Sequence, residues 1–138
     1  MPVLVDTGIW SLALRRHRSR LSEAESERIA SLHELVQDGL ARLIGPIRQE
    51  LLSGIREPAQ FERLRGQLRA FHDEALRTED FEQAAHWSNE CQRRGVSGSG
   101  VDFLICSVAI ARGWQIFTTD MDFRTYAKVV PIQLRAPL

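Results

Sequence analysis

Five acidic residues stand where short apolar segments end or helices begin, and acids placed in this way can act together. Asp6 directly follows the apolar run that opens the chain, and Asp120 follows a later run of the same kind. Asp102 precedes nine uncharged residues, and an ionised carboxylate is almost never fully buried unless it is paired or bound to a metal. The remaining two acids are Glu50 and Asp122.

The chemistry open to such acids is that of a hard metal ion. Carboxylates gathered at one place repel one another, so one or more must protonate unless a cation lies among them. Carboxylate oxygens suit Mg²⁺, with Mn²⁺ as the alternative ion. Such an ion activates water and stabilises the transition state of phosphoryl transfer. The histidines and cysteines show no metal-ligand spacing, so the acids favour metal-assisted hydrolysis of phosphodiester bonds.

Each acid, taken alone, also has a structural explanation. Asp6 and Asp102 are of the residue type that caps helices. Asp120 and Asp122 are of the type that forms turns, and Glu50 fits a solvated helix surface. The metal interpretation therefore depends on whether the fold brings these side chains together.

The elements that must position the acids follow from the hydrophobic pattern. Runs of apolar residues predict short strands, and Pro131 places the last one at a sheet edge. Helices are predicted between them, and Ser22 with Glu25 forms a capping box at the start of one. The predicted strands are 2–5, 40–44, 75–77, 114–118 and 129–134. The predicted helices are 9–14, 22–38, 46–53, 59–71, 80–94 and 101–112.

Alternating strands and helices predict an α/β fold with a mainly parallel central sheet and right-handed crossovers. In such sheets ligands bind at the carboxyl ends of the strands, which is where Asp6 and Asp120 stand. The length of 138 residues fits one domain, 1–138. We expect Cys91 and Cys106 to be reduced core residues.

Composition and charge restrict the class of protein. With 43% hydrophobic and 26% charged residues and a formal net charge of +0, the chain predicts a soluble globular protein without an overall basic surface. Lys128 is the sole lysine, so nearly all the basic residues are arginines. Arginine binds phosphate in a bidentate way, but codon bias explains the preference for arginine over lysine equally well. The basic segment 15–20 is either a solvated loop or a phosphate contact. No signal peptide or membrane span is apparent, so we expect a cytoplasmic protein.

The chain resembles PIN domains, in particular the VapC-type ribonuclease toxins of bacterial toxin–antitoxin pairs. Four segments carry the resemblance in chain order: 3–10 (VLVDTGIW), 45–52 (GPIRQELL), 101–105 (VDFLI) and 116–123 (IFTTDMDF). The resemblance implies a three-layer α/β/α sandwich with four or five strands in a mainly parallel sheet. The chain departs slightly at Cys106 and Ser107, where two alanines are common, but both residues are small.

The resemblance also implies the roles of the acids. Asp6, Glu50, Asp102 and Asp120 match the catalytic, metal-binding quartet of the family. Asp6 and Asp102 would be the firmest ligands, Asp120 would bind directly or through water, and Glu50 would orient the attacking water or bind a second ion. Asp122 matches a frequent but less essential acid, and Thr7 and Thr118 match the family's hydroxyl residues.

The activity implied is that of a Mg²⁺-dependent endoribonuclease toxin, with a cognate antitoxin, an RNA substrate and a homodimeric assembly. The alternative is a catalytically silent module that binds RNA or protein and holds a structural metal ion. A haloacid-dehalogenase-like phosphatase would need a second aspartate at the position of Gly8. A response-regulator receiver would need an acidic pair beside Asp6 and a late lysine at the site.

Overall fold

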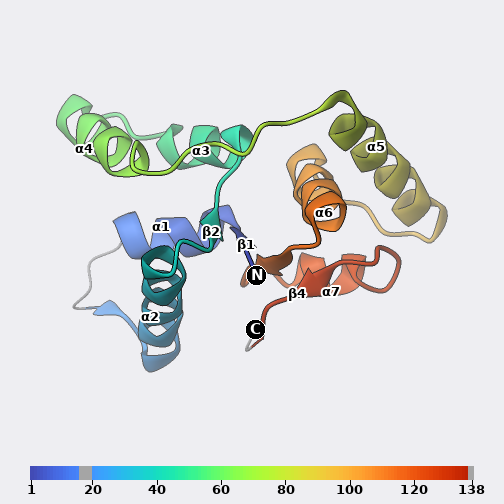
Figure 1. The fold of residues 1–138 in the computed structure, drawn as a ribbon, viewed down its shortest axis with the longest axis horizontal. Coiled ribbons are helices and arrows are strands. Elements are labelled where there is room, and N and C mark those ends of the chain that lie inside the picture. The colour runs from blue at the N-terminus through green and yellow to red at the C-terminus, as the bar shows by residue number, and fades with distance from the viewer. Residues whose placement is uncertain (16–19, 137–138) are drawn as a thin grey trace.

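The computed structural model describes residues 1–15 and 20–136, and these form a parallel sheet covered by helices (Figure 1). The strand order is β2-β1-β3-β4, so β1 lies inside the sheet and pairs with β2 on one side and β3 on the other. β4 pairs with β3 alone, which agrees with the edge position predicted from Pro131. The strands are β1 Val3–Val5, β2 Ala41–Arg42, β3 Gln115–Phe117 and β4 Gln133–Leu134.

The helices of the described residues agree with the predicted ones within a few residues, except that α7 was not predicted. Ser22 and Glu25 form the expected capping box at the start of α2, and each side chain accepts the other's backbone N–H. Gly113 ends α6 at φ 71°, a left-handed conformation that glycine adopts without steric penalty. The helices are α1 Thr7–Arg15, α2 Glu23–Gln37, α3 Gly45–Leu52, α4 Pro58–Leu68, α5 Thr78–Arg93, α6 Gly100–Arg112 and α7 Asp122–Tyr126.

Helices cover both faces of the sheet, with α1 to α4 on one side of the strands and α5 to α7 on the other (Figure 1). All three residues of β1 are buried, which explains its unbroken apolar sequence. The predicted α/β class and its parallel central sheet are therefore confirmed, with four strands among the described residues. Cys91 and Cys106 are free and buried, as predicted.

Helix α6 is anchored along its length, and this fixes where its first turn lies. Residues 103–109 are all buried, which explains the uncharged run. The Ser107 hydroxyl donates a 2.7 Å hydrogen bond to the backbone carbonyl of Asp80 in α5. At the other end, the Arg112 guanidinium binds both carboxylate oxygens of Asp80 and the carbonyl of Ala75.

The segment between α4 and α5 is not a strand, so the predicted strand Ala75–Arg77 is wrong. The carbonyl of Ala75 accepts a hydrogen bond from the Arg112 side chain, and within the described residues this part of the chain pairs only through an isolated bridge between Leu43 and Asp73. Arg48 holds the preceding residues in place by binding the carboxylate of Asp73 and the backbone carbonyls of Leu68 and Phe71.

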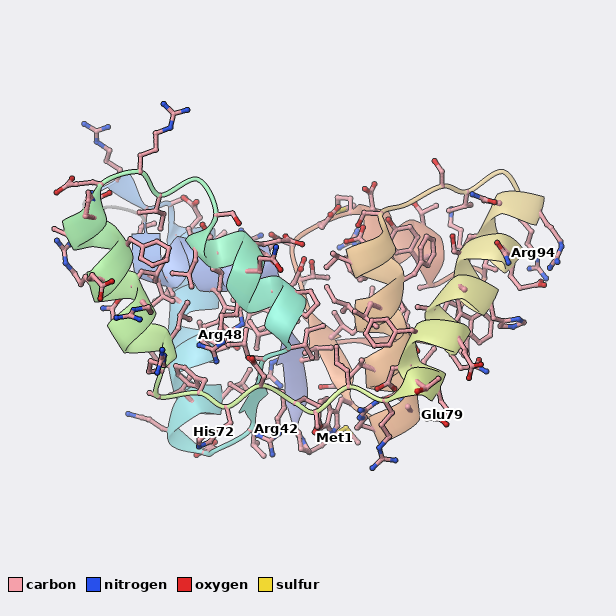
Figure 2. The ribbon with its side chains drawn as sticks, turned by 90° about the horizontal axis from the view of Figure 1, so that it is seen from above. Met1, Arg42, Arg48, His72, Glu79 and Arg94 are labelled. Atoms are coloured by element: carbon pink, nitrogen blue, oxygen red, sulfur yellow. The ribbon has the colours of Figure 1, made fainter. Side chains whose placement is uncertain are left out.

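Figure 2 shows that this segment passes along one edge of the molecule, near Met1, Arg42 and His72. Met1 precedes β1, so this is the edge where the parallel strands begin. Helix α5 begins at this edge, where Glu79 lies, and ends just before Arg94 at the opposite edge (Figure 2). The short loop after Arg94 therefore places the start of α6 near the carboxyl ends of the strands.

Two further predictions need correction or fall outside the description. The strand predicted at 40–44 is reduced to Ala41–Arg42. Of the basic segment 15–20, residues 16–19 lie outside the described residues, and Arg20 is exposed. No helix among the described residues is long and apolar enough to cross a membrane.

Candidate metal centre

Asp6 links the end of β1 to the start of α1, and its carboxylate is held by two donors. Its Oδ2 accepts a 2.7 Å hydrogen bond from Thr118 Oγ1, and its Oδ1 accepts one of 2.8 Å from the Thr7 backbone N–H. Burial raises the pKa of Asp6, and repulsion by Asp102 and Asp120 adds to this, while the two hydrogen bonds oppose it. The carboxylate therefore lies in a setting that penalises its charge.

Asp102 lies in the first turn of α6, but it is not the residue that caps the helix. Ser99 is the N-cap, and its Oγ accepts the Asp102 backbone N–H at 3.1 Å. The Asp102 carboxylate accepts a 2.7 Å hydrogen bond at Oδ2 from the Tyr126 hydroxyl. Burial raises the pKa of Asp102, hydrogen bonds from Tyr126 and Ser99 oppose this, and repulsion by nearby acids raises it further.

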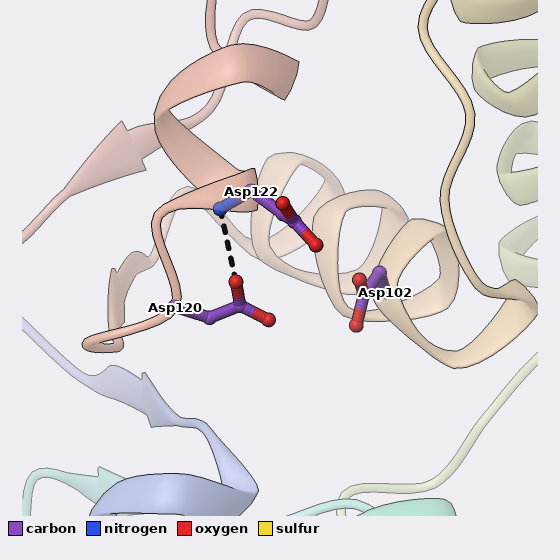
Figure 3. A group of neighbouring side chains, drawn as sticks. All are labelled: Asp102, Asp120 and Asp122. Carbon is purple, nitrogen blue, oxygen red and sulfur yellow. Dashed lines mark hydrogen bonds between the residues drawn. The ribbon is translucent and has the colours of Figure 1, made fainter.

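Asp120 and Asp122 follow β3 in a tight turn. The Asp120 backbone N–H donates to Thr118 Oγ1 at 3.0 Å, and the Asp122 backbone N–H donates to Asp120 Oδ1 at 2.9 Å (Figure 3). Figure 3 shows these two carboxylates facing that of Asp102. One carboxylate oxygen from each of the three residues lies within 4.8 Å of those of the other two.

The three-aspartate group fits the requirements of a hard divalent cation. Two oxygens bound to one Mg²⁺ at ~2.1 Å are at most ~4.2 Å apart, so small side-chain rotations would bring all three into one coordination sphere. All the donors are carboxylate oxygens, which suit Mg²⁺ or Mn²⁺ better than zinc. A cation would also offset the mutual repulsion that raises the pKa of Asp102.

Glu50 stands apart from this group, on α3. Its side chain is exposed, and Oε2 accepts a 3.1 Å hydrogen bond from Thr7 Oγ1, next to Asp6. Thr7, Glu50 and Val101 line one open hollow, so Glu50 faces the residue that precedes Asp102.

The structure groups the candidate residues differently from the sequence. Asp102 and Asp120 meet Asp122, which the sequence analysis had ranked below the quartet. Asp6 joins them through Thr118, and Glu50 is connected only through Thr7. The spacing Asp120-Met121-Asp122 was a usable signal for the third acid.

Two residues with direct contacts to Asp102 were missed by sequence reasoning. Ser99 lies in a glycine- and serine-rich loop, and the only local signal for it was the three-residue spacing to Asp102. Tyr126 gave no signal, because its contact joins residues 24 positions apart in two different helices.

The comparisons with known proteins agree with this geometry. Residues 3–129 match the PIN domain family. FitAcB from Neisseria gonorrhoeae is similar in structure, with 17% identity, a TM-score of 0.75 and 96% of each chain covered. VapBC2 from Rickettsia felis, bound to a DNA fragment from the promoter, is similar with 16% identity, a TM-score of 0.74 and 98% of each chain covered.

A toxin–antitoxin complex from Klebsiella pneumoniae gives 18% identity and a TM-score of 0.65, with 96% of this chain and 99% of that chain covered. At these identities the structural likeness shows the fold. Comparison with the curated proteins gave no match. Because the family match spans nearly the whole chain and includes Asp6, Glu50, Asp102 and Asp120, this protein belongs to the PIN domain family.

Proposed function

We propose that this PIN-domain protein is a metal-dependent endoribonuclease toxin that hydrolyses RNA phosphodiester bonds and is neutralised by a cognate antitoxin. The observation that carries the proposal is the meeting of the Asp102, Asp120 and Asp122 carboxylates, with Asp6 held beside them through Thr118. Four acids in this arrangement are best explained by a cation bound among them. RNA as the substrate rests on the likeness of the acidic segments to VapC-type toxins.

The proposed ion is Mg²⁺, or Mn²⁺ in its place, held by Asp102 and Asp120 with Asp6 and Asp122 completing the site. When bound, the ion supplies Lewis-acid chemistry, which favours deprotonation of water and offsets the negative charge of a phosphate. Glu50 lies on α3 next to Thr7, the residue that follows Asp6, and we assign its exposed carboxylate the role of accepting a proton from an attacking water. Thr7 fixes the direction of that carboxylate through its hydroxyl.

The antitoxin is supported by the solved complexes that share this fold, one of which is named a toxin–antitoxin complex. A toxin that cleaves RNA would harm its own cell unless it were inhibited, and an exposed acidic site can be covered by a basic side chain.

A homodimer is the assembly we propose for the toxin itself. The half-exposed Phe81 borders an open apolar hollow between α5 and α6 that is also lined by Ala84, Ala85 and Val101. Exposed apolar surface of this kind marks interaction sites. A second copy would bury the same surface on both subunits, as two-fold interfaces do.

RNA cleavage by the purified chain, with Mg²⁺, Mn²⁺ or EDTA, tests the proposal. We expect cleavage with either ion, none with EDTA, and none by the Asp6→Asn variant, which keeps the side-chain shape but removes the charge. Products should carry a 5′-phosphate, which ligation of an adaptor to the new ends detects. If the wild type binds Mn²⁺ and cleaves no RNA in any condition, the catalytically silent module is the better description.

A further inference from the structure

The Tyr126 side chain connects α7 to the acidic group on α6. Its hydroxyl donates a 2.7 Å hydrogen bond to Asp102 Oδ2. The residue is only 1% exposed, so this hydroxyl lies in the protein interior rather than in water. A buried hydroxyl is unfavourable unless it is hydrogen-bonded, and phenylalanine would fill the same space without that penalty. The hydroxyl therefore needs an explanation beyond packing.

The position of the phenol ring is fixed from three sides. Phe103 packs against the ring at a centroid distance of 5.0 Å, and Phe123 packs edge-on at 5.2 Å. On the third side the backbone of Gly98 lies so close that a Cβ there would be 2.3 Å from the Tyr126 hydroxyl oxygen. The backbone before α6 thus leaves room for this hydroxyl only because residue 98 is glycine.

Two of the neighbouring acids, Asp6 and Asp120, are each oriented by donors of their own. Asp6 is held by Thr118 and by a backbone N–H, and Asp120 by the backbone N–H of Asp122. Asp102 faces Asp120 and Asp122, and their repulsion favours rotation of its carboxylate away from them. The Tyr126 hydroxyl opposes that rotation, since it binds one oxygen from a fixed position.

We propose that Tyr126 is a positioning residue that holds the Asp102 carboxylate in the orientation required to share a divalent cation with Asp120 and Asp122. The proposal rests on the proposed function, because it assigns a role toward the ion of that site. Donors that orient metal-binding side chains typically change metal affinity about 10- to 100-fold when they are removed.

Calorimetric titration of the metal-free protein with Mn²⁺ tests this role without any activity assay. The Tyr126→Phe variant removes only the hydroxyl, and we expect its dissociation constant for Mn²⁺ to rise about tenfold. Ser107→Ala is the matched control: it also removes a buried hydroxyl with a 2.7 Å hydrogen bond on the α6 side, but that hydroxyl binds the Asp80 carbonyl. Ser107→Ala should lower the melting temperature and leave the Mn²⁺ affinity at the wild-type value.

A second pair of variants displaces the hydroxyl without removing it. Gly98→Ala places a methyl group against the phenol and should also weaken Mn²⁺ binding. Gly100→Ala, two residues further on at the start of α6, is the control, because an added Cβ there meets nothing within 4 Å. Wild-type Mn²⁺ affinity in folded Tyr126→Phe, or in folded Gly98→Ala should the first variant not fold, would overturn the positioning role.

Failure of the positioning role can be told apart from failure of the proposed function. If wild type binds Mn²⁺ and cleaves RNA while Tyr126→Phe binds the ion equally well, only the role of Tyr126 is lost. If the wild type binds no Mn²⁺, or if Asp102→Asn cleaves RNA at the wild-type rate, the metal-dependent nuclease itself is refuted.

Discussion

Thr118 Oγ1 donates a 2.7 Å hydrogen bond to Asp6 Oδ2, so the buried residue directly after β3 holds the first acid of the chain. The same oxygen accepts the backbone N–H of Asp120 at 3.0 Å. One hydroxyl therefore fixes two acids that are far apart in sequence. Because β1 and β3 are parallel neighbours, with Val5 paired to Phe117, their next residues emerge side by side at the same edge.

Thr118→Val tests this bridge, because valine has nearly the same shape but no hydroxyl. The change leaves a carboxylate oxygen and a backbone N–H without their partner, so we expect unfolding free energy to fall by about 1–3 kcal/mol. Urea unfolding measures the loss, and Mn²⁺ titration should show weaker binding. Thr118→Ser keeps the hydroxyl and should retain most of the unfolding free energy and of the Mn²⁺ affinity. If Thr118→Ser lost as much of each as Thr118→Val, the bridging role would be contradicted.

The raised pKa values of Asp6 and Asp102 predict how the stability of the metal-free protein depends on pH. The folded state binds protons at these acids more tightly than the unfolded chain does, whose aspartates keep the ordinary value of 3.8. The protein therefore loses stability as the pH rises from about the unfolded-state pKa of 3.8 through the raised pKa values of the folded state. Asp6→Asn should thus melt at a higher temperature than wild type at pH 7 without metal, and the gain should vanish below the ordinary aspartate pKa.

Added metal should reverse the order of these two proteins. Mn²⁺ at 100 times its dissociation constant stabilises a protein that binds it only when folded by about 2.7 kcal/mol. Wild type should gain this stability at pH 7, and Asp6→Asn should gain little. Thermal melts with and without Mn²⁺ measure both effects. Equal stabilisation of both proteins would show that Asp6 takes no part in holding the ion.

Breaking the ion pair between Asp80 and Arg112 should lower the stability of the fold without changing Mn²⁺ binding. Asp80 is 3% exposed, and hydrogen bonds from Arg112 lower its pKa. The pair therefore stabilises the fold above the ordinary aspartate pKa, and this contribution is lost as pH falls through the lowered value. Asp80→Asn leaves the guanidinium without its counterion, and we expect a loss of about 3 kcal/mol in urea unfolding. Mn²⁺ affinity of the folded variant should not change.

Phe81→Glu tests the proposed dimer. Phe81 is exposed, so the change should leave the fold intact, but a charge in the apolar hollow between α5 and α6 would oppose association. Light scattering after size exclusion should give twice the chain mass of 15.7 kDa for wild type and the single-chain mass for the variant. Met121→Glu, the same change at another exposed apolar side chain, should stay dimeric. A monomeric wild type would refute the proposal.

The sequence by itself determined the class of fold and the identity of most acids in the candidate site. Short runs such as Val3–Val5 are uncharged because both faces of the strand are covered, and such local patterns are readable without coordinates. Parallel strands place the residues after them at one edge, so the convergence of Asp6 and Asp120 followed from the pattern of elements. The capping box at Ser22 was readable for the same reason, because its contacts span three residues.

The tertiary structure decided which acids meet and what holds each one. Asp122 joined Asp102 because α7, too short to leave a clear apolar period, turns its first residue toward α6. The predicted strand Ala75–Arg77 did not form, and the Ala75 carbonyl, which would have paired with a neighbouring strand, accepts a hydrogen bond from the distant Arg112 guanidinium instead. Tyr126 could not be found from sequence, since packing against two phenylalanines and a glycine backbone directs its hydroxyl. Contacts between residues far apart in the sequence depend on how the elements pack, so the local hydrophobic pattern does not predict them.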